Sequence, residues 1–520
     1  MLDFVLDYYR VWTILLLMQF RQKTYLLFTF LIMFLSLTGY TQSKQDYVWL
    51  FGLDPSSSEE DEGFRFDFSG VSLEISESNN GVYFDNNNAS VCNKDGELLF
   101  YTNGCSIINR FGEIMPKGDS LNYDQFIDLL WADCKYGYPG VQDIMILPDP
   151  ATELGYYILH KTNVYVPNVN EFELRYSYVD MTLDSGFGDV IVKNQVYYDT
   201  TQTRPLYSYF TAVNHENGKD WWIIQPLTED SLFITFLLDE NGIHRMQNQN
   251  SHEYFTEFRT SASGTSKFSP DGSKYAMYSY YNNLHVYDFD RETGELSNHQ
   301  EIIIHDDVIF SEIWFSSVEW SPNSRFIYLT SRNGLYQVDM WAENQQDGIL
   351  LIDIYNGTED PFPTTFYLMA QAPDCRIYVC PTSSTNSYHV INDPNELGVD
   401  CNFVQNGIKL PSGTGVASMP NFPRFRVDEE DKCDPTLVSV IDSSPVIETL
   451  SIYPNPTHNV ISIDSDLEFD EIRILQLDGR IVMTEKFQQN IDVSLLERGM
   501  YVIQFIENGR VQSTKKFIKR

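Results

Sequence analysis

Two short runs place a histidine beside carboxylates, the residue types that general acid–base catalysis uses. His215 opens the run His-Glu-Asn-Gly-Lys-Asp-Trp-Trp at 215–222, and His305 is followed by Asp306 and Asp307. Adjacent residues of a strand point to opposite faces, so at most one pair within 305–307 could share a site. For His215 the Asn-Gly turn favours a buried or turn-capping role over catalysis.

No other pattern in the sequence carries a recognisable reaction. It has no GxSxG elbow, HExxH helix, P-loop or Rossmann glycine fingerprint. The acidic runs at 59–62 and 428–431 lack the alternating ligands and glycine of an EF-hand, and no cysteine or histidine spacing suggests zinc. We therefore assign no catalytic residue and expect no metal and no cofactor.

The seven cysteines suggest disulfides if the chain reaches an oxidising compartment, with one thiol left over. Cys375 and Cys380 lie five positions apart in one expected strand at 374–381 and point to opposite faces, so they should not bridge each other. We expect a bridge within the group Cys92, Cys105 and Cys134.

The charge balance excludes one class of partner. The chain holds 35 Lys and Arg against 73 Asp and Glu, a net charge of −38, and the acidic excess lies between residues 43 and 448. Such a surface repels phosphate backbones and anionic lipids, so we expect no nucleic-acid ligand. The aromatic and hydrophobic content of the same region predicts a folded core.

The elements around these residues repeat. A turn signal followed by an aromatic, β-branched strand recurs six times, with spacings of roughly 50 residues and one longer interval that predicts an insertion within 162–194. Such a period is typical of the four-stranded blades of a β-propeller, which bury their faces only against their neighbours. The turns are Asp95-Gly96, Asp149-Pro150, Asn217-Gly218, Asp271-Gly272, Asn323-Ser324 and Asp374-Cys375.

Two of these turns carry a family resemblance. Phe-Ser-Pro-Asp-Gly-Ser-Lys-Tyr at 268–275 and Trp-Ser-Pro-Asn-Ser-Arg-Phe at 320–326 resemble the repeats of TolB-type and tryptophan-aspartate-type (WD40-like) propellers. Runs near residues 49, 92, 215 and 419 are similar to an uncharacterised group of secreted propellers, which implies a fold but no activity. The Asp boxes of sialidase propellers do not match, because Gly272 follows Asp271 directly.

The ends of the repeat region predict how the ring closes. Residues 46–52 and 64–68 have the pattern of inner and middle strands without an opening strand, whereas 415–422 has the pattern of an opening strand followed only by linker. Joined, they would make a seventh blade and leave no exposed sheet edge. We expect one seven-bladed propeller at 46–425 and an acidic linker at 426–448.

The last 72 residues form a separate all-β module. Apolar and polar residues alternate at 460–463, 472–477 and 500–505, as in half-buried strands, and glycine turns separate them. Four ordered motifs, Tyr-Pro-Asn-Pro, Leu-Asp-Gly-Arg, Leu-Glu-Arg-Gly-Met-Tyr and a basic tail, resemble the type A sorting domain of the type IX secretion system. The resemblance implies an immunoglobulin-like β-sandwich at 449–520 that binds the secretion machinery. The motif residues are Tyr453, Pro454, Asn455, Pro456, Asp478, Gly479, Gly499, Tyr501, Lys515 and Lys516.

The N-terminus has the features of a signal peptide. A basic stretch at 18–23 precedes thirteen apolar residues at 25–37, too few to span a bilayer, and small residues allow cleavage between Thr41 and Gln42. We expect a signal peptide at 1–41, with Met18 as a plausible true start, and no stable transmembrane span in the mature chain. The protein should then be secreted or attached to the outer-membrane surface of a Gram-negative bacterium.

Two functions stay open. We favour a propeller that binds a protein or glycan through loops at one mouth of the ring, because no catalytic residues are recognisable. The alternative is a secreted hydrolase or lyase that acts on polysaccharide or peptide at the central channel. Two or three carboxylates converging there with an Arg or His would favour the enzyme, and an apolar or aromatic rim would favour binding.

Overall fold

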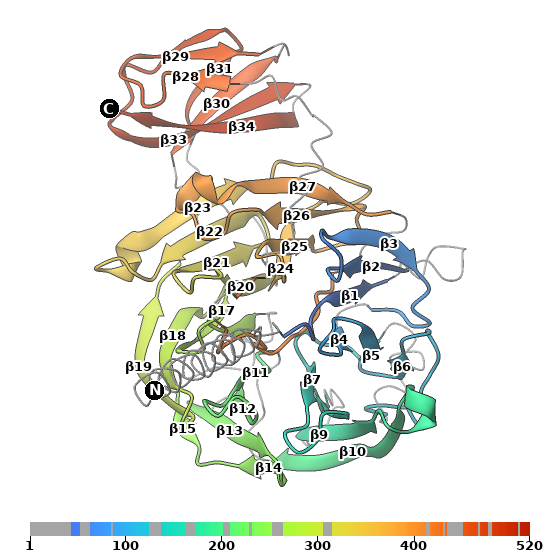
Figure 1. Cartoon of the computed structure of the whole chain (residues 1–520). Helices are drawn as coiled ribbons and strands as arrows, with labels where there is room; N and C mark the ends of the chain where they lie inside the picture. The colour runs from blue at the N-terminus through green and yellow to red at the C-terminus, as the bar shows by residue number, and fades with distance from the viewer. Residues whose placement is uncertain are drawn as a thin grey trace, which may run out of the picture. The chain divides into compact units, whose positions relative to one another are not determined.

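A computed structural model of the chain describes residues 43–52, 63–84, 87–123, 137–162, 172–200, 208–227, 231–251, 264–304, 315–411, 417–429, 432–433, 451–465, 469–476, 481–507 and 510–520. Within this part, seven antiparallel sheets follow one another along the chain up to residue 409, and two further sheets follow residue 450 (Figure 1). Among the described residues, no helix is both long and apolar enough to cross a bilayer.

Each of the seven sheets is a meander of consecutive strands. The first contains β1 (Val48–Phe51), β2 (Gly63–Asp67) and β3 (Glu74–Ser78), and the second β4 (Ala89–Cys92), β5 (Leu98–Thr102) and β6 (Ile107–Asn109). The third contains β7 (Ile144–Pro148), β8 (Gly155–Lys161), β9 (Phe172–Asp180) and β10 (Asp189–Thr200). The fourth contains β11 (Thr211–Asn214), β12 (Trp221–Pro226), β13 (Leu232–Asp239), β14 (Gly242–Arg245) and β15 (Gln249–Asn250). The fifth contains β16 (Thr265–Phe268), β17 (Lys274–Ser279), β18 (Asn283–Asp290) and β19 (Glu295–Ile302). The sixth contains β20 (Ser316–Trp320), β21 (Phe326–Ser331), β22 (Gly334–Asp339) and β23 (Ile349–Ile354), and the seventh β24 (Phe366–Gln371), β25 (Ile377–Pro381), β26 (Ser387–Ile391) and β27 (Phe403–Lys409).

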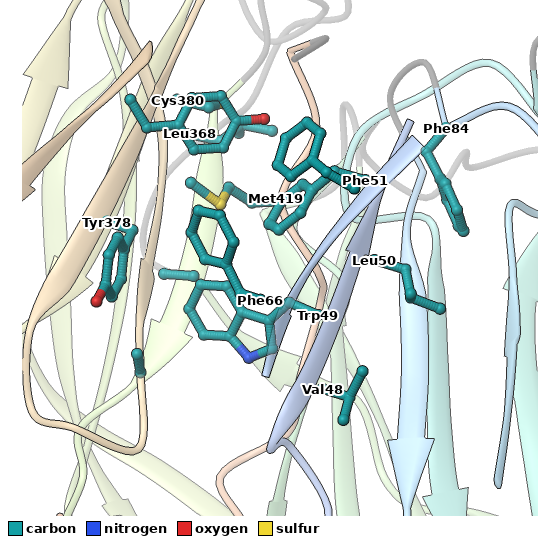
Figure 2. Packing of buried hydrophobic residues seen from close by; sticks show 14 of the residues in the cluster. Val48, Trp49, Leu50, Phe51, Phe66, Phe84, Leu368, Tyr378, Cys380 and Met419 are labelled. Atoms are coloured by element: carbon teal, nitrogen blue, oxygen red, sulfur yellow. The ribbon is translucent and has the colours of Figure 1, made fainter. Parts of the chain in front are cut away.

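Buried apolar clusters join every consecutive pair of these sheets and also join the last to the first. At the closing contact Trp49 of β1 meets Tyr378 of β25, with ring centroids 5.8 Å apart (Figure 2). Phe51 of β1 meets Tyr388 of β26, with ring centroids 5.6 Å apart. Because each sheet buries both faces only against its neighbours, the sheets form a closed ring of seven blades. The predicted propeller is confirmed.

The six predicted turns all connect the first strand of a sheet to its second. In all six, an Asn or Asp side chain accepts a hydrogen bond from the backbone N–H two residues later. In four of them a residue with positive φ directly follows that side chain, as at Gly272 (φ 70°) and Ser324 (φ 59°), which completes the reversal. The repeat in the sequence is therefore a repeat of one turn geometry.

The ring closes differently from the prediction. Strand β1 runs opposite to β4, because Ser90 Oγ donates to Val48 O (2.7 Å) and the Cys92 N–H to Gln45 O (2.8 Å). Residues 417–426 lie beside β1 in the opposite direction, where an opening strand would lie, and Phe422 packs 6.0 Å from Trp49. Figure 2 shows Met419 of this segment against the same cluster.

This segment makes no strand pairing with β1, so the predicted opening strand is wrong for its described residues. Its one backbone bridge is parallel and joins Arg424 to Val213 of β11. Pro420 and Pro423 have no N–H to give to a ladder, which explains why a strand cannot form there. Residues 415 and 416 lie outside the described part.

Beyond residue 450 two sheets form a small sandwich. One contains β28 (Ser451–Tyr453), β29 (Val460–Asp464) and β32 (Asn490–Asp492). The other contains β31 (Ile481–Lys486), β30 (Glu471–Gln476), β33 (Gly499–Glu507) and β34 (Arg510–Lys519), in that order. Residues of both sheets, such as Ile461 and Phe505, share one buried cluster. The three predicted strands correspond to β29, β30 and β33, and the predicted sandwich is confirmed.

Candidate functional site

The channel of the ring is occupied by the chain's own segment 417–429. The buried Asn421 side chain donates to Ile144 O and Phe210 O, both at 3.0 Å, and its backbone N–H donates to Asn88 O at 2.9 Å. Gln142 Nε2 donates to Asn421 Oδ1 at 3.3 Å. Asn421 alone thus makes hydrogen bonds to residues that lie in or just before the first strands of the second, third and fourth blades.

Arg424 makes the corresponding contacts with the fourth to the seventh blades. Its backbone N–H donates to Ala212 O (3.3 Å) and its Nε to Phe268 O (2.7 Å). The two Nη atoms donate to Gln371 Oε1 (3.1 Å) and to the buried carboxylate of Glu319. Asn421 meets the beginnings of the first strands and Arg424 mostly their ends, so the segment threads the channel from one mouth to the other.

The segment is held again where it leaves the channel. Arg426 donates two hydrogen bonds to Asp46, at 2.5 and 2.6 Å, and both side chains are buried. Val427 is buried in an apolar cluster, and Asp428 pairs with Arg291 at 2.7 and 2.9 Å. Residues 426–428 thus pack on the ring, although the sequence places them in the linker.

A disulfide between Cys375 and Cys433, with Cα atoms 5.1 Å apart, fixes the end of this segment to the first turn of the seventh blade. Cys380 is a buried free thiol, so the predicted absence of a 375–380 bridge is confirmed. Cys105 is disulfide-bonded, as expected for its group, whereas Cys92 is free and buried.

Charged side chains do converge in the channel, as the enzyme hypothesis requires. Each carboxylate, however, is paired with an arginine of the threading segment, Glu319 with Arg424 and Asp46 with Arg426. The cavity left beside them measures about 40 Å³, enough for water or a small ion but not for a sugar or a peptide. The arrangement neutralises and positions the segment, and among the described residues it leaves a cavity of only about 40 Å³ beside these carboxylates.

The two mouths of the ring carry different connections. The face with the turns between first and second strands, here called the turn face, has short connections at 93–97, 149–154, 215–220, 269–273, 321–325 and 372–376. The opposite face, the loop face, lies where the last strand of one blade ends and the first strand of the next begins, and the stretches of sequence between these strands are longer. The chain leaves the channel at the turn face, where Cys433 is bound.

Exposed aromatic side chains occur on both faces. On the loop face, Tyr123, Tyr281 and Phe362 are 50, 41 and 48% exposed and come from three different blade regions. On the turn face, Trp341 is 67% exposed. Exposed aromatic side chains alone therefore do not show which face binds a ligand.

The histidine run at 215–222 does not form an acid–base site. His215 stacks on Trp222, with ring centroids 5.6 Å apart, and its Nδ1 accepts from the Asn217 N–H at 3.0 Å. The predicted turn-capping role is confirmed. The run at 305–307 and the acidic run at 59–62 lie outside the described residues, and within the described ones no three His, Cys, Asp or Glu side chains group as metal ligands.

In the C-terminal sandwich the first motif and the basic tail come together. Asn455 Nδ2 donates to Lys516 O, and Asn455 Oδ1 accepts from the Ile518 N–H, both at 2.9 Å. Tyr501 stacks on Phe517 with centroids 5.5 Å apart. The first motif and the basic tail, which lie at opposite ends of this domain's sequence, are therefore in direct contact.

The remaining motif residues take simpler positions. Tyr453 ends β28 and is half exposed, Gly499 pairs with Lys519, and Lys515 pairs with Ile503. Pro454 and Pro456 flank Asn455. Asp478, Gly479, Thr41 and Gln42 lie outside the described residues.

Sequence reasoning missed the residues that fill the channel. Asn421 falls in the expected opening strand at 415–422, Arg426 in the expected linker at 426–448, and Arg424 between the two. One signal was present, since two arginines, Arg424 and Arg426, lie just before the acidic run at 428–431. Their partners, distant carboxylates and main-chain carbonyls, could not be named without the fold.

The C-terminal module matches a family model. Residues 451–520 match the "Secretion system C-terminal sorting domain". A search of curated proteins found no match.

Solved structures resemble the ring weakly. A protein from Lactobacillus plantarum is 11% identical (TM-score 0.39, covering 72% of this chain and 98% of that one). A putative 6-phosphogluconolactonase from Bacteroides uniformis is 12% identical (TM-score 0.39, 72% and 98%). A periplasmic gluconolactonase from Pseudomonas aeruginosa is 11% identical (TM-score 0.36, 71% and 98%). At these values no activity transfers to this chain.

Proposed function

Since this chain is a seven-bladed β-propeller exported through the type IX secretion system by its C-terminal sorting domain, we propose that it is a secreted or cell-surface binding protein. Its ligand is a protein or a glycan, and the loop face of the ring binds it. The observation that carries this proposal is the threaded channel, because Asn421 and Arg424 occupy the axial space where a substrate would sit.

Two features favour the loop face. Its blade-to-blade connections are longer than the turns of the opposite face, and long loops on a rigid scaffold are where binding residues concentrate. The chain also leaves the ring at the turn face, where the Cys375–Cys433 disulfide holds it and the tether to the sorting domain begins. The loop face is therefore the face that carries no tether.

Among the described residues, no geometry supports the alternative function, a hydrolase or lyase that acts at the central channel. Its two channel carboxylates, Asp46 and Glu319, are buried and bonded to arginines. A carboxylate held in this way cannot reach a substrate as an acid or a base unless the segment leaves the channel.

A glycan array and a peptide library screened with the exported protein test the proposal. The double variant Tyr281→Ala/Phe362→Ala removes two exposed aromatics of the loop face, and Trp341→Ala removes one from the turn face as the matched control. We expect the double variant to lose at least tenfold in affinity for the ligand found and the control to keep it. Loss in the control with retention in the double variant would contradict the assignment of the face, and the absence of any ligand together with polysaccharide or peptide cleavage would contradict binding.

A further inference from the structure

The side chain of Lys267 is almost fully buried, and its ammonium group has no hydrogen-bond or ion-pair partner among the described residues. Lys267 lies in β16, is 7% exposed and lines the channel cavity. Its Nζ makes no hydrogen bond and no ion pair with any residue that the structure describes. Burying an unpaired charge costs several kcal/mol, so native structures rarely leave one uncompensated.

The other charges that line the cavity are already satisfied. Arg424 is paired with Glu319 and Arg426 with Asp46. Lys432 Nζ donates to three carbonyls, Arg426 O at 3.1 Å, Val427 O at 2.5 Å and Glu429 O at 2.7 Å.

The lining therefore holds four cations against two carboxylates, inside a chain with a net charge of −38. The local excess of positive charge opposes the sign of the whole molecule. Among the described residues, Lys267 is the cation of this lining for which no acceptor is found.

Burial lowers the pKa of Lys267 to about 8, against the opposing effect of the Glu319 carboxylate. The amine thus still carries a proton at neutral pH and needs an acceptor. Nearby Arg424 adds to the positive potential around it.

The size of the cavity limits what can supply that acceptor. At about 40 Å³ it exceeds the 10–15 Å³ or so that one water needs, but it excludes any sugar or nucleotide. Water alone would satisfy the hydrogen bonds of the ammonium, but its charge would then be balanced only by the Glu319 carboxylate, which Arg424 already pairs, in a medium of low dielectric constant. A monovalent anion would accept hydrogen bonds from the ammonium and also balance its charge.

We propose that the channel cavity binds one small inorganic anion, of the size of chloride, against Nζ of Lys267 and beside Arg424. The anion contacts the fifth blade through Lys267 and the threading segment through Arg424. It therefore stabilises the segment in the channel.

Anomalous diffraction from crystals of the full mature chain grown in sodium bromide tests the site directly. We expect a bromide peak within about 3.5 Å of Lys267 Nζ. Density in the cavity without an anomalous peak would show that water fills it and would overturn the proposal.

Thermal unfolding in sodium chloride and in sodium gluconate, at equal ionic strength, gives a second readout in solution. Gluconate is too large for the cavity, so we expect chloride to raise the Tm by roughly 2 °C or more, because it binds the folded state alone. Lys267→Met should abolish this difference. Lys274→Met, which removes a half-exposed lysine paired with Asp288, should keep it. An equal chloride effect in Lys267→Met, or none in the parent, would contradict the site.

Discussion

Arg426 donates two parallel hydrogen bonds to Asp46 across 380 residues of sequence. The pair fastens the segment that leaves the channel to the chain just before β1, the first strand of the ring. Both side chains are under 10% exposed, so the pair is shielded from water and salt. The ring is thus closed by apolar packing between its first and last blades and by a buried ion pair at its turn face.

Replacing Arg426 by methionine should destabilise the ring strongly. The variant leaves the Asp46 carboxylate buried without its partner, which costs about 3–5 kcal/mol of unfolding free energy. Lys274→Met breaks the exposed pair with Asp288 and should cost less than about 1 kcal/mol. Urea unfolding of both variants measures the difference, and equal losses would show that Arg426 does not close the ring.

Removing the disulfide should free the end of the threading segment. Cys433→Ser opens the bridge to Cys375, which spans 58 residues, and should lower the unfolding free energy by roughly 2–4 kcal/mol. In limited proteolysis we expect the parent to be cut first within 434–450, whereas the variant is also cut within 426–433.

Cys401→Ala removes a thiol outside any disulfide and serves as the control. Its pattern of cuts should match that of the parent. A Cys433→Ser variant with the parent's pattern would indicate that the other contacts hold residues 426–433 without the bridge.

Whether the sequence alone predicts a feature of this molecule depends on how far apart in the sequence the interacting residues lie. The turns at Asp271 and Asn323 are local devices, in which a side chain bonds to the backbone two residues later, so their repetition revealed the blades. The sandwich strands followed from alternation for the same reason. The course of 417–429 depends instead on carbonyls of distant blades, such as Ile144 O and Phe268 O, and no local pattern encodes those partners.

The ring should lose stability in acid because several histidines are buried as neutral groups. Burial lowers the pKa of His160 and of His389 to about 3 and that of His285 to about 4, from an ordinary value near 6.5. Below pH 6.5 the unfolded chain binds protons that the folded chain does not, so stability falls as the pH drops toward 4.

Urea midpoints at pH 7.5 and 4.5 measure this loss. His160→Gln should be less stable than the parent at pH 7.5, because it disturbs the bond to Asn122, yet lose less between the two pH values. An equal or larger loss in the variant would show that His160 is not among the groups that set the acid dependence.

Export should require the end of the sorting domain. Deleting the chain from Gly499 onward removes β33 and β34 together with the contacts of Asn455 with residues 516 and 518. We expect the truncated protein to stay in the periplasm and the full chain to reach the cell surface, as followed by fractionation with an antibody to the propeller.

Leu495→Ala changes a side chain that is 92% exposed within the same domain and should leave export intact. Surface delivery of the truncated chain at the level of the full one would show that the last two strands are dispensable for sorting.

Hydrogen–deuterium exchange of the full chain tests the threaded channel most directly. The N–H groups of Asn421 and Arg424 are bonded to Asn88 O and Ala212 O inside the ring, so a peptide covering 417–427 should exchange as slowly as the inner strands β16 and β20. Exchange of 417–427 within seconds, as in an unfolded chain, would show that the segment lies outside the channel and would contradict the account.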